Sequence, residues 1–231
     1  MTGIPLKMKK YPVLFLIVLL TAVPAFSQKI KIQISGPGEI KGRKAVLLTR
    51  EKGFAAMVHS VKLTTGTVEL EIGADQVPDL YQLHVSQTHG SLFFFLEPDT
   101  KIQLDTTDLS KSVVTHSKSN PAWEAYQNEI QRPYDNLYNA FTAGETRARK
   151  QNQTDSLAYW LDRKITEHRN LLKKTGDFIL NNPASYVSLY LLKNNWYAFK
   201  DKGLFEKLDV SLASHRSYKF LKERGRGVAR N

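Results

Sequence analysis

The first half of the chain has the apolar spacing of β-strands. Isoleucine alternates with lysine and glutamine over Ile30–Ile34, and similar alternation or short apolar runs recur between turn residues up to Ser117. Eight segments show this pattern: Ile30–Ile34, Ala45–Leu48, Met57–Val61, Val68–Ile72, Tyr81–Val85, Leu92–Leu96, Ile102–Leu104 and Val113–Val114. Eight short strands at close spacing predict an antiparallel β-sandwich or open barrel over residues 28–117.

One of these segments has no polar alternation. Leu92–Leu96 reads Leu-Phe-Phe-Phe-Leu and runs into the acidic turn Glu97-Pro98-Asp99. A strand with apolar residues on both faces is expected to be covered on both faces. We therefore expect Leu92–Leu96 to be a central strand of its sheet.

After Ser117 the apolar residues recur every three or four positions, which predicts helices. Asn120-Pro121-Ala122 has the form of an N-cap followed by proline in the first turn. Pro133 should kink or split the helix that follows. The polar stretch 144–154 is expected to be a loop.

Four further helical segments are expected beyond that loop. A long apolar stripe predicts a second helix over 155–181, and a repeated Asn-Pro-Ala sequence at 182–184 predicts the start of a third. Shorter helices are expected near 204–212 and 218–221. The fold class is therefore predicted to be α+β, with a β-sandwich domain at 28–117 and a helical subdomain at 118–213.

Residues 1–27 have the pattern of a secretory signal peptide. Three lysines precede an uncharged apolar run from Tyr11 to Val23, and small residues at Ala25 and Ser27 suit signal peptidase. The alternative, a membrane anchor, is disfavoured because 13 residues of helix reach only about 20 Å of a ~30 Å hydrocarbon core. We expect cleavage before Gln28 and export to the periplasm or cell envelope of a Gram-negative bacterium, with no transmembrane helix after cleavage.

The net charge of +11 is concentrated at the two ends. Three of the 33 basic residues belong to the signal peptide, and residues 214–231 hold six basic residues against one acidic residue. Residues 28–213 are close to neutral, with a net charge of +3. Because an exported protein does not meet the DNA and RNA of the cell, no nucleic-acid partner is predicted. We expect 214–231 to be a basic C-terminal tail or truncated linker with a frayed, solvated end at 225–230; contact of the basic residues with anionic lipid is the alternative.

The chain has no cysteine. Disulfides, thiol nucleophiles, thiolate zinc sites and thiol redox chemistry are therefore excluded. The motifs Gly-x-Ser-x-Gly and Gly-x-x-x-x-Gly-Lys are also absent from the sequence. No catalytic residue, cofactor or metal ligand is predicted, and the chain is not expected to be an enzyme.

Four sequence features together resemble a known domain. They are a first strand ending in glycine (32–36), a glycine-turn hairpin (65–70), an aromatic strand running into an acidic-proline turn (93–99), and a helix opening with Asn-Pro (182–185). Their order resembles the uncharacterised N-terminal domain of exported thioredoxin-like proteins of the thiol-disulfide interchange and peroxiredoxin (AhpC/TSA) type. The resemblance implies association with a thioredoxin-like module, although no Cys-x-x-Cys sequence is present.

The histidines do not form a recognised ligand spacing. His84 and His89 are five apart, on opposite faces of a continuous strand unless the turn at His89-Gly90 redirects the second. We interpret them as residues at the end of a strand rather than a metal site. His168 lies on the apolar stripe of the second helix and is expected to be a partly buried core residue rather than a catalytic base.

Carboxylates and aromatic residues supply the remaining candidates. Glu69 and Glu71 share one strand face, and their alternation with apolar residues puts both on the solvated face, which disfavours acid–base catalysis. Aromatic residues crowd the helical half, at a spacing that favours core packing over an aromatic-lined sugar or peptide groove. They are Trp123, Tyr126, Tyr134, Tyr138, Trp160, Tyr186, Tyr190, Trp196 and Tyr197.

Three hypotheses for function follow. The first is a non-catalytic exported module that docks on a protein partner. The resemblance implies a partner of the thioredoxin-like class, and exposed sheet edges are one physical means of docking. The second is an envelope carbohydrate- or peptide-binding protein, or a hydrolase, that uses the aromatic helical half. The third is the N-terminal part of a longer thiol-disulfide oxidoreductase, which a Cys-x-x-Cys motif encoded after Asn231 would show.

Overall fold

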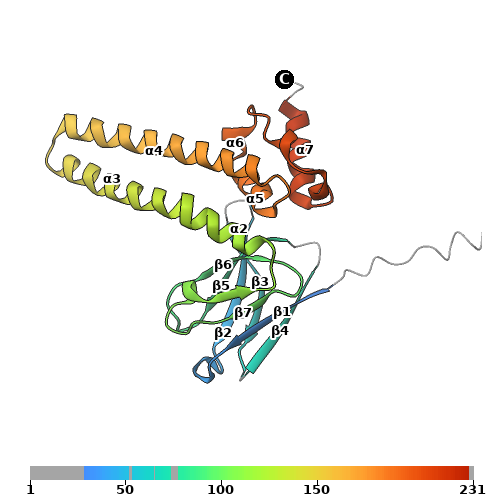
Figure 1. Cartoon of the computed structure of the whole chain (residues 1–231). Coiled ribbons are helices and arrows are strands. Elements are labelled where there is room, and N and C mark those ends of the chain that lie inside the picture. Colours follow the sequence, from blue (N-terminus) through green and yellow to red (C-terminus); the bar gives the residue numbers. More distant parts are fainter. Residues whose placement is uncertain (1–28, 52–53, 65, 74–77, 229–231) are drawn as a thin grey trace, which may run out of the picture.

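The computed structural model describes residues 29–51, 54–64, 66–73 and 78–228 (Figure 1). The predicted signal peptide and cleavage site lie outside the described residues, as does the end of the basic tail. Within the described ranges, no helix is both long enough and apolar enough to cross a bilayer.

The eight predicted strands are confirmed and form two four-stranded sheets. They are β1 Lys29–Gly36, β2 Lys44–Glu51, β3 Phe54–Lys62, β4 Gly66–Gly73, β5 Asp79–Val85, β6 Leu92–Leu96, β7 Lys101–Gln103 and β8 Val113–Thr115. The strand orders are β4-β1-β7-β8 and β3-β2-β5-β6. With the helices, the molecule has the predicted mixed α+β fold.

One strand pair departs from the antiparallel expectation. β1 and β7 are parallel, whereas the other five neighbouring pairs of these sheets are antiparallel. A parallel pair requires a long connection, and here the chain forms the whole second sheet between the two strands. No hairpin turn therefore fixes the position of β7 beside β1.

The prediction of a central position for Leu92–Leu96 is wrong. β6 is the last strand of its sheet. Its lack of polar residues has another cause: Leu92, Phe94 and Leu96 pack into the cluster shared by both sheets, while Phe95 packs under the helices. Phe93, on the helix side, remains 41% exposed.

The helices follow the strands in the chain. They are α2 Ser119–Tyr126, α3 Arg132–Lys150, α4 Thr154–Asn181, α5 Tyr186–Asn194, α6 Trp196–Phe199 and α7 Arg216–Val228. Short 3₁₀ turns are η1 Gly38–Ile40, η3 Leu109–Lys111, η5 Phe205–Lys207 and η6 Val210–Leu212. α2 and α3 are joined by a π-helical turn, η4 Gln127–Gln131, just before Pro133. The predicted splitting of this helix at proline is confirmed.

Two predicted helix starts are wrong. α2 begins before Asn120, whose side chain bonds the backbone of Phe95 instead of capping the helix. The carboxylate of Glu97 accepts hydrogen bonds from the backbone N–H groups of Lys118 and Ser119, so a residue from the strand half caps α2. α5 begins after Ser185, whose hydroxyl accepts from the Val187 N–H.

The predicted loop at 144–154 is mostly helix. α3 continues to Lys150, and a three-residue turn leads into α4. Gly144 does not break α3 because its missing side chain admits the Trp160 ring: an added Cβ would lie 2.4 Å from Trp160 Cε2. The glycine allows close approach of two helices.

Most described residues of the predicted basic tail form α7, which includes the short helix expected at 218–221. The side chains of 226–230, where a solvated end is expected, lie outside the described residues. α7 packs into the helical core through Leu221, which is fully buried. At its start, Arg216 forms a 2.8 Å ion pair with Asp79 of β5, and His215 Nε2 lies 2.7 Å from the Pro78 carbonyl oxygen. Amphipathic spacing within the basic segment, rather than its charge, decides its structure.

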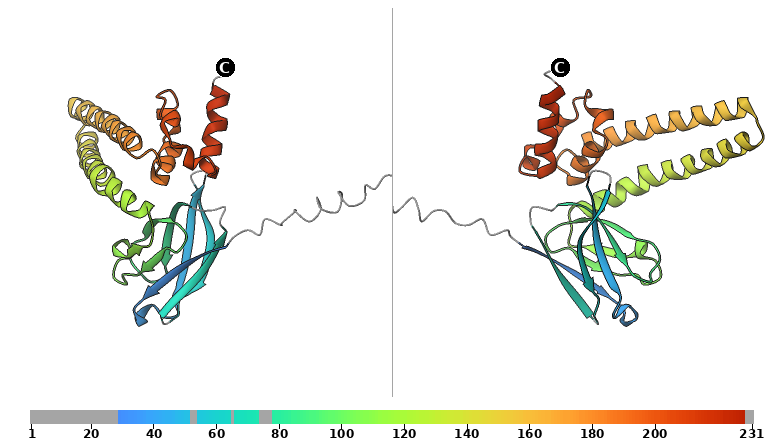
Figure 2. Two further views of the ribbon diagram at one scale, coloured as in Figure 1. Left: turned by 45° about the vertical axis from the view of Figure 1, so that its right-hand side comes forward. Right: turned by 180° about the vertical axis from the view of Figure 1, so that it is seen from behind.

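The overall shape has a compact body and a projecting arm. Figures 1 and 2 show α3 and α4 as an antiparallel hairpin that extends away from the sheets, with α5, α6 and α7 gathered at its base. We call this α3–α4 unit the hairpin. Its base joins the helical cluster through residues such as Ile179 and Phe178, and its outer part lies beyond that cluster.

Candidate functional site

A groove lies between the two halves of the molecule. It has a volume of about 480 Å³ and lies between β6, the η3–β8 segment and the helical run from α2 to the start of α3. Its lining residues are Ser91, Leu92, Phe93, Ser110, Lys111, Ser112, Val113, Trp123, Glu124, Gln127, Asn128 and Arg132. β6 and β8 are edge strands of different sheets, so the groove runs along the side of the sheets and beside the helix.

A second hollow of about 420 Å³ adjoins the first. It shares Phe93, Trp123 and Gln127 with the groove and adds the following residues: Leu80, Tyr81, Gln82, Gln131, Asp135 and Tyr190. Because three lining residues are common to both, we treat the two hollows as one site, the β6–α2 groove. Its size is in the range of small-ligand sites.

The aromatic part of the groove is held by packing. Trp123 lies 5.8 Å from the Phe95 ring, 5.9 Å from Tyr126 and 6.0 Å from Tyr190, measured between ring centroids. Tyr126 is fixed further by a 3.1 Å hydrogen bond to Thr175, and burial raises the pKa of its hydroxyl. The predicted role in core packing is confirmed for Trp123, Tyr126 and Tyr190, and Trp123 also faces the groove. The prediction is wrong for Tyr138 and Tyr197, which are 37% and 78% exposed.

The polar rim is ordered by hydrogen bonds one helical turn apart. Gln131 Nε2 donates to Asp135 Oδ1 at 2.9 Å, and Arg132 Nη1 donates to Asn128 Oδ1 at 2.6 Å. Gln127 makes no side-chain hydrogen bond to any other residue that the structure describes. Hydrogen bonds therefore hold the carboxamides of Asn128 and Gln131, but not that of Gln127.

The groove has no dominant charge. Lys111 and Arg132 are its cationic residues, and Glu124 and Asp135 are its anionic residues. Equal numbers of opposite charges give no net attraction for either an anion or a cation. The arrangement is suited to an uncharged polar ligand.

The edge of β6 beside the groove is closed in part by a side chain. Asn120 Oδ1 accepts from the Phe95 backbone N–H at 2.9 Å, and its Nδ2 donates to the Phe95 carbonyl at 2.7 Å. The carboxamide thus takes the place that a neighbouring strand would occupy. An added strand could not pair with β6 beyond this point without displacing Asn120.

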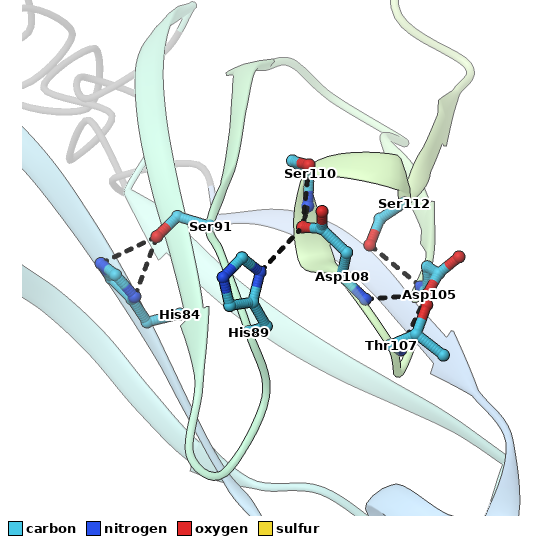
Figure 3. A network of polar contacts seen from close by, with 8 residues as sticks. All are labelled: His84, His89, Ser91, Asp105, Thr107, Asp108, Ser110 and Ser112. Carbon is cyan, nitrogen blue, oxygen red and sulfur yellow. Dashed lines mark hydrogen bonds and ion pairs between the residues drawn. The ribbon is translucent and has the colours of Figure 1, made fainter.

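A serine and a histidine meet next to the groove (Figure 3). Ser91 Oγ lies 3.0 Å from His84 Nδ1 and 3.3 Å from Nε2, so it sits beside the ring edge rather than in line with one nitrogen. Gln82 Nε2 lies 2.8 Å from His84 Nε2. A serine nucleophile needs one ring nitrogen in line with its hydroxyl to accept the proton, and the two Ser91–His84 distances single out no such nitrogen. The pair lacks the arrangement of a nucleophile and its base.

His89 belongs to a separate turn network, also drawn in Figure 3. Its Nδ1 is 3.8 Å from Asp108 Oδ1, and its side chain is largely exposed. Hydrogen bonds from Ser110, chiefly from its hydroxyl, lower the pKa of Asp108, and those from Thr107 do the same for Asp105. Gly90, at φ +73°, fits here because an added Cβ would lie 2.4 Å from Asp108 Oδ1. This network stabilises a turn.

The remaining sequence candidates are not brought together. His168 is exposed, unlike the prediction of a partly buried residue, and lies 3.5 Å from the Tyr134 hydroxyl. Glu69 is exposed as predicted, and the side chain of Glu71 lies outside the described residues. In the described part of the chain, no three His, Cys, Asp or Glu residues gather in a way that could hold a metal ion.

The hairpin forms a second candidate surface. Tyr138 of α3 and Leu161 and Ile165 of α4 are exposed by 37%, 37% and 52%. Leu161 and Ile165 are one turn apart, and Lys164 between them lies 4.5 Å over the Tyr138 ring. We call these three apolar residues the hairpin patch. Sequence periodicity assigned these residues to the apolar stripes of the two helices. The spacing alone did not show that no helix or strand of the described chain covers them.

An ion pair and an aromatic contact join the two helices of the hairpin, and a second ion pair lies within α3. Lys164 Nζ is 2.9 Å from Glu145 Oε2, and Arg149 is 2.7 Å from Glu145 Oε1. These hydrogen bonds lower the pKa of Glu145, and the bond to Glu145 raises that of Lys164. Phe141 packs on Trp160 at 6.0 Å. The patch is therefore presented on a preformed pair of helices.

Comparison with protein-family models, with curated proteins and with solved structures gave no match in any of the three.

Proposed function

We propose that this chain is a non-catalytic module that docks on a protein partner through the hairpin patch. The observation that carries this proposal is the exposure of Tyr138, Leu161 and Ile165 on an arm that projects from the body. Large apolar side chains exposed together favour an interaction site. The buried centre of a protein interface is more apolar than the rest of the surface, and tyrosine is enriched there.

The geometry of the arm supports docking on another protein. α4 has 28 residues, which corresponds to about 42 Å of helix. The Glu145–Lys164 pair and the Phe141–Trp160 contact already fix the two helices relative to each other. A preformed surface loses little conformational entropy on binding. A partner helix could pack along α4 and cover Leu161 and Ile165 in one seam.

The class of partner is inferred from sequence resemblance. Proteins that this chain resembles carry a thioredoxin-like module after a domain of this type, so a thioredoxin-like oxidoreductase is the partner that we propose. Because the chain has no cysteine, redox chemistry in such a complex would belong to the partner. The shifted pKa values of Glu145, Lys164 and Asp108 arise in ion pairs and turns, which supports a structural origin for them.

We also infer that the complex forms outside the cytoplasm. The lysines, apolar run and small residues of 1–27 support cleavage before Gln28 and export to a Gram-negative periplasm or cell envelope.

We infer that the two sheets pack face to face as a β-sandwich. One apolar cluster contains Ile34 and Ile102 from the first sheet and Leu47, Leu83 and Phe94 from the second, which supports this arrangement.

Site-directed photocrosslinking tests the docking proposal. A photoreactive amino acid replaces Ile165 in the patch or, as a control, Asn139, an exposed polar residue of α3. In envelope extracts we expect one crosslinked protein from position 165 and none from position 139, with mass spectrometry identifying a Cys-x-x-Cys domain. Equal labelling from both positions would contradict docking at the patch, and a captured protein without a thioredoxin-like domain would contradict the partner class.

A further inference from the structure

We propose that the β6–α2 groove is a binding site for an uncharged saccharide. This inference goes beyond the docking function and depends on a different surface, since the groove and the hairpin patch have no residue in common. It combines three observations: exposed aromatic surface in the groove, a partly ordered rim of carboxamides, and balanced charge.

The aromatic surface suits the apolar face of a sugar ring. Phe93 lies on the helix side of β6, is 41% exposed and lines both hollows. Trp123 lines both hollows as well, and Phe95, Tyr126 and Tyr190 hold it in place. A pyranose ring presents C–H groups on its faces, and these pack on flat aromatic side chains while the hydroxyls point outward.

The rim suits the hydroxyl groups of the same ligand. A carboxamide has two donors and an acceptor with two lone pairs, so it can bond neighbouring hydroxyls of a sugar in either sense. Gln82, Gln127 and Asn128 supply this chemistry from both walls. The Gln131–Asp135 and Arg132–Asn128 bonds hold this part of the rim before a ligand arrives, which reduces the entropy cost of binding there. Gln127, which these bonds do not hold, would become ordered on binding.

Two observations disfavour other ligands. A strongly anionic or cationic ligand would meet as many like charges as opposite charges, because Lys111 and Arg132 are matched by Glu124 and Asp135. An extended peptide that adds to β6 would have to displace the Asn120 carboxamide from Phe95. A neutral, compact ligand with many hydroxyls meets neither obstacle.

Titration of the purified chain with neutral sugars tests the site. The probes are maltose, cellobiose, chitobiose and maltotriose, and the measurements are isothermal titration calorimetry and saturation-transfer NMR. We expect at least one probe to bind, and Phe93→Ala and Gln127→Ala each to weaken it by about tenfold. Phe93→Tyr should retain binding, and Tyr197→Ala, at an exposed aromatic residue outside the groove, should not change it.

The alternative outcomes each contradict the proposal in a distinct way. No binding up to about 10 mM of every probe would exclude a functional saccharide site. Saccharide binding that neither Phe93→Ala nor Gln127→Ala weakens would place the ligand elsewhere. Binding of an extended peptide that Phe93→Ala abolishes would show the wrong ligand class. Circular dichroism checks that each variant is folded. If Phe93→Ala does not fold, Gln127→Ala, at a partly exposed position, still tests the groove.

Discussion

At the scale of single residues, two side chains join the strand and helical halves. Glu97, at the end of β6, bonds backbone N–H groups at the start of α2, and Asn120, inside α2, bonds both backbone groups of Phe95. Both side chains are buried. Sequence patterns placed Glu97 in a turn and Asn120 at a helix start. The hydrogen bond partners of each lie in the other half of the molecule, and these contacts depend on the tertiary fold.

Asn120→Ala tests this connection. The substitution leaves the buried N–H and C=O of Phe95 without their partner, so we expect a loss of about 2 kcal/mol in the free energy of unfolding. Urea unfolding followed by circular dichroism measures it. Asn139→Ala is the control at an exposed helical position and should change the free energy by less than about 0.5 kcal/mol. Equal losses for the two variants would show that the Phe95 bonds do not stabilise the fold.

At the scale of elements, the hairpin shows where periodicity predicts well and where it does not. The long α4 was predicted to within one residue at its start, because its apolar stripe is continuous. The glycine and polar residues at 144–154 predicted a loop, but α3 runs on to Lys150. In the sequence, a glycine that ends a helix cannot be told from a glycine that allows a tryptophan to pack closely. Only the position of Trp160 in the structure shows which of the two Gly144 is.

Gly144→Ala should therefore destabilise the protein although alanine favours helices. The added Cβ would overlap the Trp160 ring, and such overpacking costs about 1–3 kcal/mol, against a helix-propensity gain of about 1 kcal/mol. Gly225→Ala, in α7, is the matched control because its added Cβ would be 3.9 Å from Trp196. It should stabilise by about 0.5–1 kcal/mol. The urea midpoint is measured for both variants. Shifts in the same direction from the wild-type midpoint would contradict the packing role of Gly144.

The docking of α7 should weaken in mild acid. Burial is the largest cause that lowers the pKa of His215, and the neutral ring donates from Nε2 to Pro78 while Nδ1 accepts from the Ser217 N–H. A folded-state pKa below the unfolded value means that stability is fully present above about pH 6.5 and is lost as the pH falls through the folded value. Protonation of Nδ1 would break the Ser217 bond.

Urea unfolding at about pH 7.5 and about pH 5 measures this dependence. We expect the wild-type chain to lose more stability between these two values than His215→Gln, whose side chain does not titrate. Other ionisable groups contribute equally to both proteins, so the difference reports His215. An identical loss in the two proteins would show that His215 does not link α7 docking to pH.

At the scale of the whole molecule, the structure separates two surfaces with different chemistry. The hairpin patch is apolar and projects from the body, whereas the β6–α2 groove is polar, aromatic and lies against the sheets. The α+β class, the eight strands and the main helices could be predicted because each follows from local periodicity.

Neither surface could be predicted from the sequence. The groove needs Phe93 on an edge strand, but its apolar neighbours indicated a central strand. The patch needs Ile165 to be uncovered, and helical spacing is the same for covered and uncovered apolar residues. Strand order and helix contacts decide both features, and these are long-range properties of the fold.

The measurement that tests the central claim most directly is the affinity of the purified chain for the partner identified by crosslinking. Calorimetry compares the wild-type chain with Ile165→Glu in the hairpin patch and Phe93→Ala in the groove. We predict that Ile165→Glu weakens the complex by about tenfold or more and that Phe93→Ala leaves it unchanged. Unchanged affinity for Ile165→Glu would contradict docking through the hairpin.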